Sequence, residues 1–187
     1  IDQAVFAFQQ TQRGLWMSTR QQLLFYDGTS FTAYDTVGGD YVGTVHRIVQ
    51  DASGTVWFAT LQSGLLRYDG SGLKRYTTED GLSSNRLAAL AVDAQERLWV
   101  GLSDRVNRWD GEGFTSLSVM EGVNGGTLQA LVVDPDGYVW MGTERGVYVR
   151  PPGDSLDAFT TEDGLNDNTT YLLHLDRNGC RFGRAHV

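Results

Sequence analysis

Short apolar runs alternate along the chain with clusters of Gly, Asp, Asn and Ser. Each run is four to six residues long, which suits a β-strand better than a helix. One such run, Leu87–Val92, is apolar and leads into an Asp-containing turn. The next strand of each unit carries a tryptophan; these strands are predicted at Thr55–Thr60, Arg97–Gly101 and Tyr138–Thr143. The pattern predicts an all-β protein made of many short strands joined by tight turns.

The tryptophans set a regular period. They are Trp16, Trp57, Trp99 and Trp140, spaced by 41, 42 and 41 residues, and a further 42 residues lead to Phe182. An aspartate stands six residues before each of the last four of these aromatic positions: Asp51, Asp93, Asp134 and Asp176. The chain therefore contains four full sequence repeats and the first part of a fifth.

Two further landmarks divide each repeat. Ten or eleven residues after the tryptophan comes an aromatic-Asp-Gly turn, at Tyr26–Gly28, Tyr68–Gly70 and Trp109–Gly111. This turn has the chemistry of a tight hairpin and separates a third strand from a fourth. The fourth strands are predicted to start near Phe31, Leu73, Phe114 and Leu156.

Four strands in a repeat of 40 to 45 residues are typical of a β-propeller blade. We predict a single propeller domain over residues 1–187, with four full four-stranded blades, half of a fifth, and an incomplete or open ring. The predicted repeats span residues 2–42, 43–84, 85–125, 126–167 and 168–187. The tryptophans are interpreted as packing residues between blades, and the turn aspartates as caps that accept hydrogen bonds from backbone amides.

The repeat resembles that of the two-component regulator propeller family. The best copy runs from Asp51-Ala-Ser-Gly-Thr-Val-Trp57 through Gly64-Leu-Leu-Arg-Tyr-Asp-Gly70 to Glu79-Asp-Gly-Leu82 and Asn85. Kelch and sialidase-type Asp-box repeats share part of this pattern but lack the Glu-Asp-Gly-Leu linker. The resemblance implies a periplasmic or extracellular sensor propeller. The sequence shows no kinase and no output domain, and it reads as a truncated piece of a larger propeller.

Charge and composition limit the classes of partner that the chain is expected to bind. The net charge of −8, with Lys74 as the only lysine, argues against nucleic acid, because phosphate binding needs a basic surface. The sequence contains no run of 18 apolar residues, so it does not predict insertion into a membrane. The half blade would leave strand edges and apolar faces open, so we predict a homodimer formed through the incomplete blade.

The first functional hypothesis is a binding module for a small polar molecule at the channel mouth. The loops that lead from one blade to the next carry carboxylates and amides, which suit a polyol or a cation, and Tyr41 could stack on a sugar. The predicted ligand-binding residues are Asp40, Tyr41, Glu121 and Asn168.

The second hypothesis is a metal-dependent hydrolase acting on an ester, a lactone or a phosphotriester. His46 and His174 fall on first strands, which line a propeller channel, and His186 falls at the end of the last second strand. Histidines from different blades could hold a divalent metal such as zinc or calcium, which activates water. Paraoxonase and gluconolactonase propellers are analogies of fold only. A third hypothesis is a scaffold for protein contacts, and the sequence leaves all three open.

Overall fold

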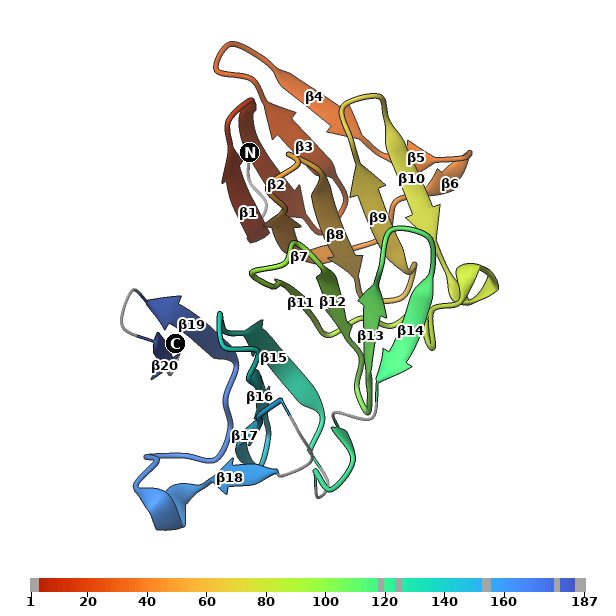
Figure 1. Ribbon diagram of the computed structural model, residues 1–187. Helices are drawn as coiled ribbons and strands as arrows, with labels where there is room; N and C mark the ends of the chain where they lie inside the picture. The colour runs from red at the N-terminus through yellow and green to blue at the C-terminus, as the bar shows by residue number, and fades with distance from the viewer. Residues whose placement is uncertain (1–3, 118–119, 124–125, 153–155, 177–178, 184–187) are drawn as a thin grey trace. The chain divides into compact units, whose positions relative to one another are not determined.

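The computed structural model describes residues 4–117, 120–123, 126–152, 156–176 and 179–183. It divides into two compact units, residues 1–87 and 88–187, and each unit is described by itself. Both consist of antiparallel sheets whose strands follow one another in chain order (Figure 1).

The first unit holds two four-stranded sheets, which we call blades 1 and 2. Blade 1 consists of β1 (Val5–Thr11), β2 (Gly14–Thr19), β3 (Leu23–Tyr26) and β4 (Phe31–Tyr34). A small hairpin of β5 (Thr36–Val37) and β6 (Asp40–Tyr41) leads to the next sheet. Blade 2 consists of β7 (Val45–Gln50), β8 (Val56–Thr60), β9 (Leu65–Tyr68) and β10 (Leu73–Tyr76).

The second unit holds blades 3 and 4 and a two-stranded fifth sheet. Blade 3 consists of β11 (Ala89–Val92), β12 (Leu98–Gly101), β13 (Val106–Trp109) and β14 (Phe114–Leu117). Blade 4 consists of β15 (Leu128–Val133), β16 (Val139–Thr143), β17 (Gly146–Arg150) and β18 (Asp157–Phe159). The fifth sheet pairs β19 (Leu172–Asp176) with β20 (Gly179–Gly183). The predicted fold class is confirmed: four four-stranded blades and half of a fifth.

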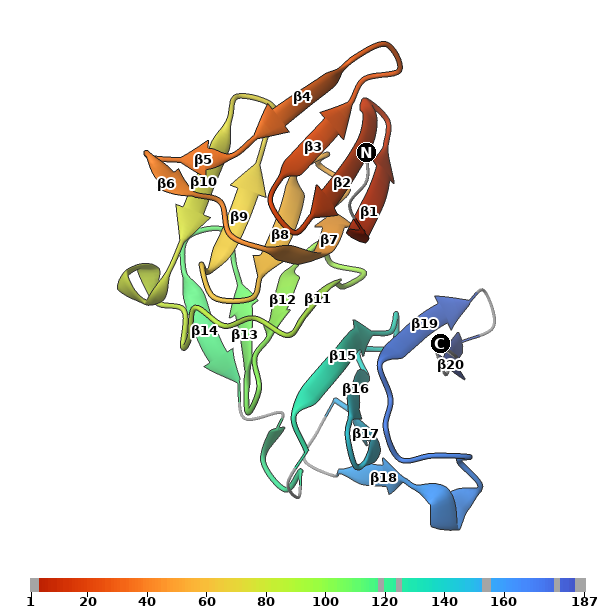
Figure 2. The ribbon, with the colours of Figure 1, turned by 180° about the vertical axis from the view of Figure 1, so that it is seen from behind.

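Successive first strands lie side by side within each unit. β1 adjoins β7 in the first unit, and β15 lies between β11 and β19 in the second (Figures 1 and 2). Blades pack face to face through apolar cores. Trp16 packs among Phe25, Tyr34, Phe58 and Tyr68, with ring centroids 4.9–5.1 Å apart. Burial of such large side chains drives the stacking of one blade on the next, as predicted for the tryptophans.

The aspartates six residues before the tryptophans of blades 2, 3 and 4 do more than cap their turns. The carboxylate of Asp51 accepts a hydrogen bond from the Thr55 backbone amide at 3.0 Å and another from the Trp57 indole at 3.0 Å. The same pair of contacts occurs in blade 3 at Asp93 and in blade 4 at Asp134. The predicted backbone cap is confirmed, and the indole contact explains why aspartate and tryptophan stand six residues apart.

The aspartates of the second turn also cap backbone amides, as predicted. Asp27 accepts from the amides of Thr29 and Ser30, and Asp110 from those of Glu112 and Gly113, at 2.7–3.0 Å. These hydrogen bonds lower the pKa of both carboxyl groups below the ordinary range.

The Thr-Thr-Glu-Asp-Gly-Leu linkers form short 3-10 helices, η1 (Thr78–Asp80) and η3 (Thr161–Asp163). In η1 the Thr77 side chain and the Asp80 carboxylate form a reciprocal capping box, which satisfies the free amides of the first turn. Gly81 ends the helix in the left-handed conformation, at φ 96°. No helix in the described part of the chain is long and apolar enough to cross a membrane.

Candidate functional site

The loop face of the first unit brings three connections together. The β5–β6 hairpin turns at Gly38 and Gly39, whose positive φ values of 63° and 93° suit a tight two-residue turn. The Tyr41 hydroxyl donates to the backbone oxygen of Arg20, in the β2–β3 turn, at 3.0 Å. This bond ties the hairpin to the neighbouring turn of blade 1.

Arg75 ties the same hairpin to blade 2. Its guanidinium group donates to the backbone oxygen of Tyr41 at 2.6 Å and to that of Ser63, in the β8–β9 turn, at 3.0 Å. Arg75 is half-buried in β10. Because a guanidinium group is planar and always charged, two carbonyl contacts fix its plane and leave its positive charge at this loop face.

Asp40 and Tyr41, the two predicted ligand-binding residues of the first unit, therefore lie on a braced hairpin. Both are exposed, and 48% of the Tyr41 surface is open to solvent. Tyr41 is anchored at both ends, because its ring hydroxyl and its backbone oxygen each make a hydrogen bond. The hairpin thus presents an anchored tyrosine and an exposed carboxylate on neighbouring residues, and their role toward a ligand stays a prediction.

The other two predicted ligand-binding residues lie in the second unit. Glu121 is exposed, and its backbone oxygen accepts a hydrogen bond from Arg150. The side-chain oxygen of Asn168 accepts from the Thr161 amide at 2.7 Å, just as Asn85 does from Thr78 at 2.9 Å. The Asn168 amide oxygen therefore stabilises its own loop. Its role toward a ligand stays a prediction.

The histidines do not form a described cluster. His46 lies in β7 and is half-buried, whereas His174 lies in β19 and is exposed. His186 falls outside the described residues. Within the described ranges, no group of three or more His, Cys, Asp or Glu side chains is placed to hold a metal ion. The metal site predicted from His46, His174 and His186 stays a prediction.

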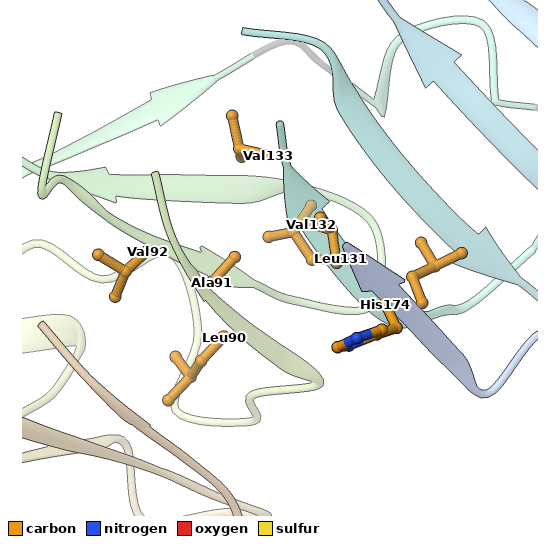
Figure 3. Close-up of a pocket in the computed structure, with 8 residues that line it drawn as sticks. Leu90, Ala91, Val92, Leu131, Val132, Val133 and His174 are labelled. Carbon is orange, nitrogen blue, oxygen red and sulfur yellow. The ribbon is translucent and has the colours of Figure 1, made fainter. Parts of the chain in front are cut away.

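A hollow of about 280 Å³ lies along the first strands of the second unit (Figure 3). It is lined by residues of β11, β15 and β19: Leu90, Ala91, Val92, Leu131, Val132, Val133, Leu173 and His174. Its one titratable side chain is His174, whose imidazole projects from β19 toward the hollow (Figure 3). This aliphatic lining offers shape and one polar group, but no set of groups for acid–base chemistry.

Comparison with known proteins supports the assignment made from the repeats. Residues 122–145 match the family described as "Two component regulator propeller". A search of curated proteins gave no match.

Solved structures show the same fold. The extracellular domain of the hybrid two component system BT3049 from B. thetaiotaomicron superposes with a TM-score of 0.79 at 19% identity, over 94% of this chain and 25% of that one. The extracellular domain of the one component system BT4673 from the same organism gives 0.74 at 18%, over 92% and 25%. A streptogramin B lyase gives 0.72 at 10% identity, over 97% and 62%.

These likenesses extend to extracellular domains of two component and one component systems and to a lyase, so they establish the fold and not an activity. The chain spans about a quarter of the length of the two extracellular domains. The repeat and the fold agree that the chain is a β-propeller module, and its residues 122–145 are similar to the two component regulator propeller family.

Proposed function

We propose that the chain is a ligand-binding module of a sensor-type propeller, located outside the cytoplasm, and that it binds a small polar molecule at the β5–β6 hairpin. The observation that carries the proposal is the braced and exposed ring of Tyr41. A tyrosine held by its neighbours offers a rigid contact surface at low conformational cost, which is why such residues serve in binding sites.

The chemistry around the ring favours a sugar or another polyol. The aromatic face suits the C–H face of a sugar ring, and the exposed carboxylate of Asp40 can accept hydrogen bonds from hydroxyl groups. The positive charge of Arg75, whose guanidinium group contacts the Tyr41 backbone oxygen, favours a ligand with an additional acceptor group. The extracellular location of the similar sensor domains supports exposure to such ligands.

The proposal is tested by titrating a panel of neutral and acidic mono- and oligosaccharides, with isothermal calorimetry and saturation-transfer NMR as readouts. For a sugar that binds, Tyr41→Ala should weaken affinity about tenfold or more, because a stacked aromatic contributes on the order of 1–3 kcal/mol. Tyr41→Phe keeps the ring but removes its bond to Arg20, so it should weaken binding less.

Tyr138→Ala is the matched control. Tyr138 is 39% exposed and lies beside the Asp134–Gly137 turn of the second unit, so its loss removes an exposed tyrosine without touching the hairpin. Equal losses in the Tyr41→Ala and Tyr138→Ala proteins, or unchanged affinity in the former, would show that the ligand binds elsewhere.

A further inference from the structure

Arg75 carries a positive charge that has no counter-ion among the described residues. The side chain is half-buried in β10, and its guanidinium group donates to the backbone oxygens of Tyr41 and Ser63. No carboxylate in the described part of the chain forms an ion pair with it. Charged side chains that lose part of their hydration are as a rule paired with an opposite charge. Arg75 is therefore suited to an anionic group that comes from a ligand.

The guanidinium group also has hydrogen-bond donors to spare. It carries five N–H groups. Nη1 uses one of its two on the Ser63 oxygen at 3.0 Å, and Nη2 uses one of its two on the Tyr41 oxygen at 2.6 Å. Nε is buried and meets no acceptor among the described residues. Because the contact with Tyr41 lies at the surface, we expect the second N–H of Nη2 to be the donor that a ligand can reach.

Tyr41 links this donor to the proposed ligand site. Its backbone oxygen contacts Nη2 of Arg75, and its ring is 48% exposed on the same hairpin. A ligand that contacts the ring therefore lies close to the guanidinium group. The exposed carboxylate of Asp40 is the neighbour of Tyr41 in sequence and forms no ion pair with Arg75. Asp40 thus repels an anionic ligand at the hairpin, and its removal gives a second test of the charge of that ligand.

We propose that the ligand of the hairpin is a sugar acid, whose ring lies against Tyr41 and whose carboxylate accepts hydrogen bonds from Arg75. The proposal rests on the ligand site proposed above and names its chemical class. A hydrogen bond between a guanidinium group and a carboxylate is roughly twice as strong as one between neutral groups. A sugar that carries a carboxylate therefore gains more from Arg75 than the neutral sugar of the same ring.

Matched pairs of sugars test the proposal. Methyl glucuronide is compared with methyl glucoside, and methyl galacturonide with methyl galactoside, together with short oligomers of each, by isothermal calorimetry. Within a pair the ring is the same and only a carboxylate replaces a hydroxymethyl group. The readout is the ratio of the affinity for the acid to the affinity for the neutral sugar. In the wild type we expect a ratio of about ten or more for the sugar that binds.

Four variants locate the source of this ratio. Arg75→Gln removes the charge and should lower the ratio to about one, whereas Arg75→Lys loses the planar pair of contacts but keeps the charge and should retain most of the preference. Asp40→Asn removes a repelling carboxylate and should raise the ratio about threefold. Lys74→Gln is the matched control, because Lys74 precedes Arg75 in β10, is exposed, and lies over the Tyr76 ring on the opposite face of the strand. It should leave the ratio unchanged.

The ratio separates recognition of the carboxylate from a purely structural role of Arg75. If Arg75 only braces the hairpin, its replacement weakens the acid and the neutral sugar equally, and the ratio stays as in the wild type. That result would overturn the proposal, as would an equal fall of the ratio in Lys74→Gln. Neutral sugars that bind through Tyr41 as tightly as their acids would overturn it too, while the ligand site itself would stand. If no sugar of either kind binds, both the ligand site and its assigned class are wrong.

Discussion

The Asp93 carboxylate accepts four hydrogen bonds, and its removal tests the role assigned to the repeat motif. One of its oxygens accepts from the amides of Gln95 and Arg97 at 3.0 and 2.9 Å. The other accepts from the Arg97 guanidinium at 2.7 Å and the Trp99 indole at 2.8 Å. Asp93 is 3% exposed and Trp99 is 6% exposed. Asp93→Ala would therefore leave the indole N–H buried without an acceptor.

The expected loss follows from these contacts. A buried donor left without an acceptor costs about 1–3 kcal/mol. The remaining three donors are partly solvated and regain water, so together they add roughly 1 kcal/mol. We expect Asp93→Ala to lower the free energy of unfolding by about 3 kcal/mol. For a chain of this length that corresponds to a decrease in Tm of roughly 6–12 °C.

Urea unfolding followed by tryptophan fluorescence measures the loss. Asp110→Ala is the matched control, because Asp110 also accepts from two backbone amides, at 3.0 and 2.9 Å, but is exposed in its turn. We expect the control to lose less than about 1 kcal/mol, as is usual for an exposed turn. A loss at Asp93 no larger than at Asp110 would refute the idea that the carboxylate–indole contact stabilises the blade.

Three further predictions concern pH and backbone strain. Burial alone would raise the pKa of Asp93, but hydrogen bonds from the Trp99 indole and from Arg97 outweigh burial and lower the pKa. The free energy of unfolding should therefore fall as pH drops below about 4. The fall should be smaller in Asp93→Asn, and the unfolding midpoint measured across an acid titration checks both expectations. Burial, together with a hydrogen bond and an electrostatic interaction with Tyr68, raises the pKa of Tyr34 to about 12. The stabilisation of the fold by the neutral Tyr34 hydroxyl should persist below pH 10 and be lost as pH rises through 12. Ultraviolet titration should show one tyrosine that ionises at this high pH, and Tyr34→Phe should lack it. Gly64→Ala should lower the Tm, because φ is +80° there and a Cβ would collide with the Tyr76 backbone oxygen, whereas Gly113→Ala, where a Cβ meets nothing, should change it little.

The repeat made most of the fold predictable. The Trp16, Trp57, Trp99 and Trp140 spacing located the blades, and the predicted second strands differ from β8, β12 and β16 only by the first residue. The η1 helix was not predicted, although Thr77 and Asp80 carry the spacing of a capping box. The carboxylate–indole bond was missed because the aspartate was read only as a turn residue.

The candidate site was less predictable than the fold. Asp40 and Tyr41 are neighbours in sequence, so their common position on a hairpin follows from the turn at Gly38 and Gly39. The contribution of Arg75 depends on contacts 34 residues apart in the chain, which no local pattern shows. Similarly, the use of the Asn168 oxygen inside its own loop depends on three-dimensional geometry.

The two linker helices have a consequence for how such chains change in length. η1 and η3 have nearly the same geometry, with φ values of −132° and −131° at Thr77 and Thr160 and of 96° and 99° at Gly81 and Gly164. The capping-box hydrogen bonds lie within each linker, as does the one that the Thr78 amide donates to the Asn85 side-chain oxygen. The Asn85 backbone oxygen also accepts from the Gly64 amide, which belongs to the preceding blade. Because these hydrogen bonds do not involve the blade that follows the linker, the linker should keep its structure when one 41- or 42-residue repeat is duplicated or deleted. The number of blades can therefore change in single genetic steps.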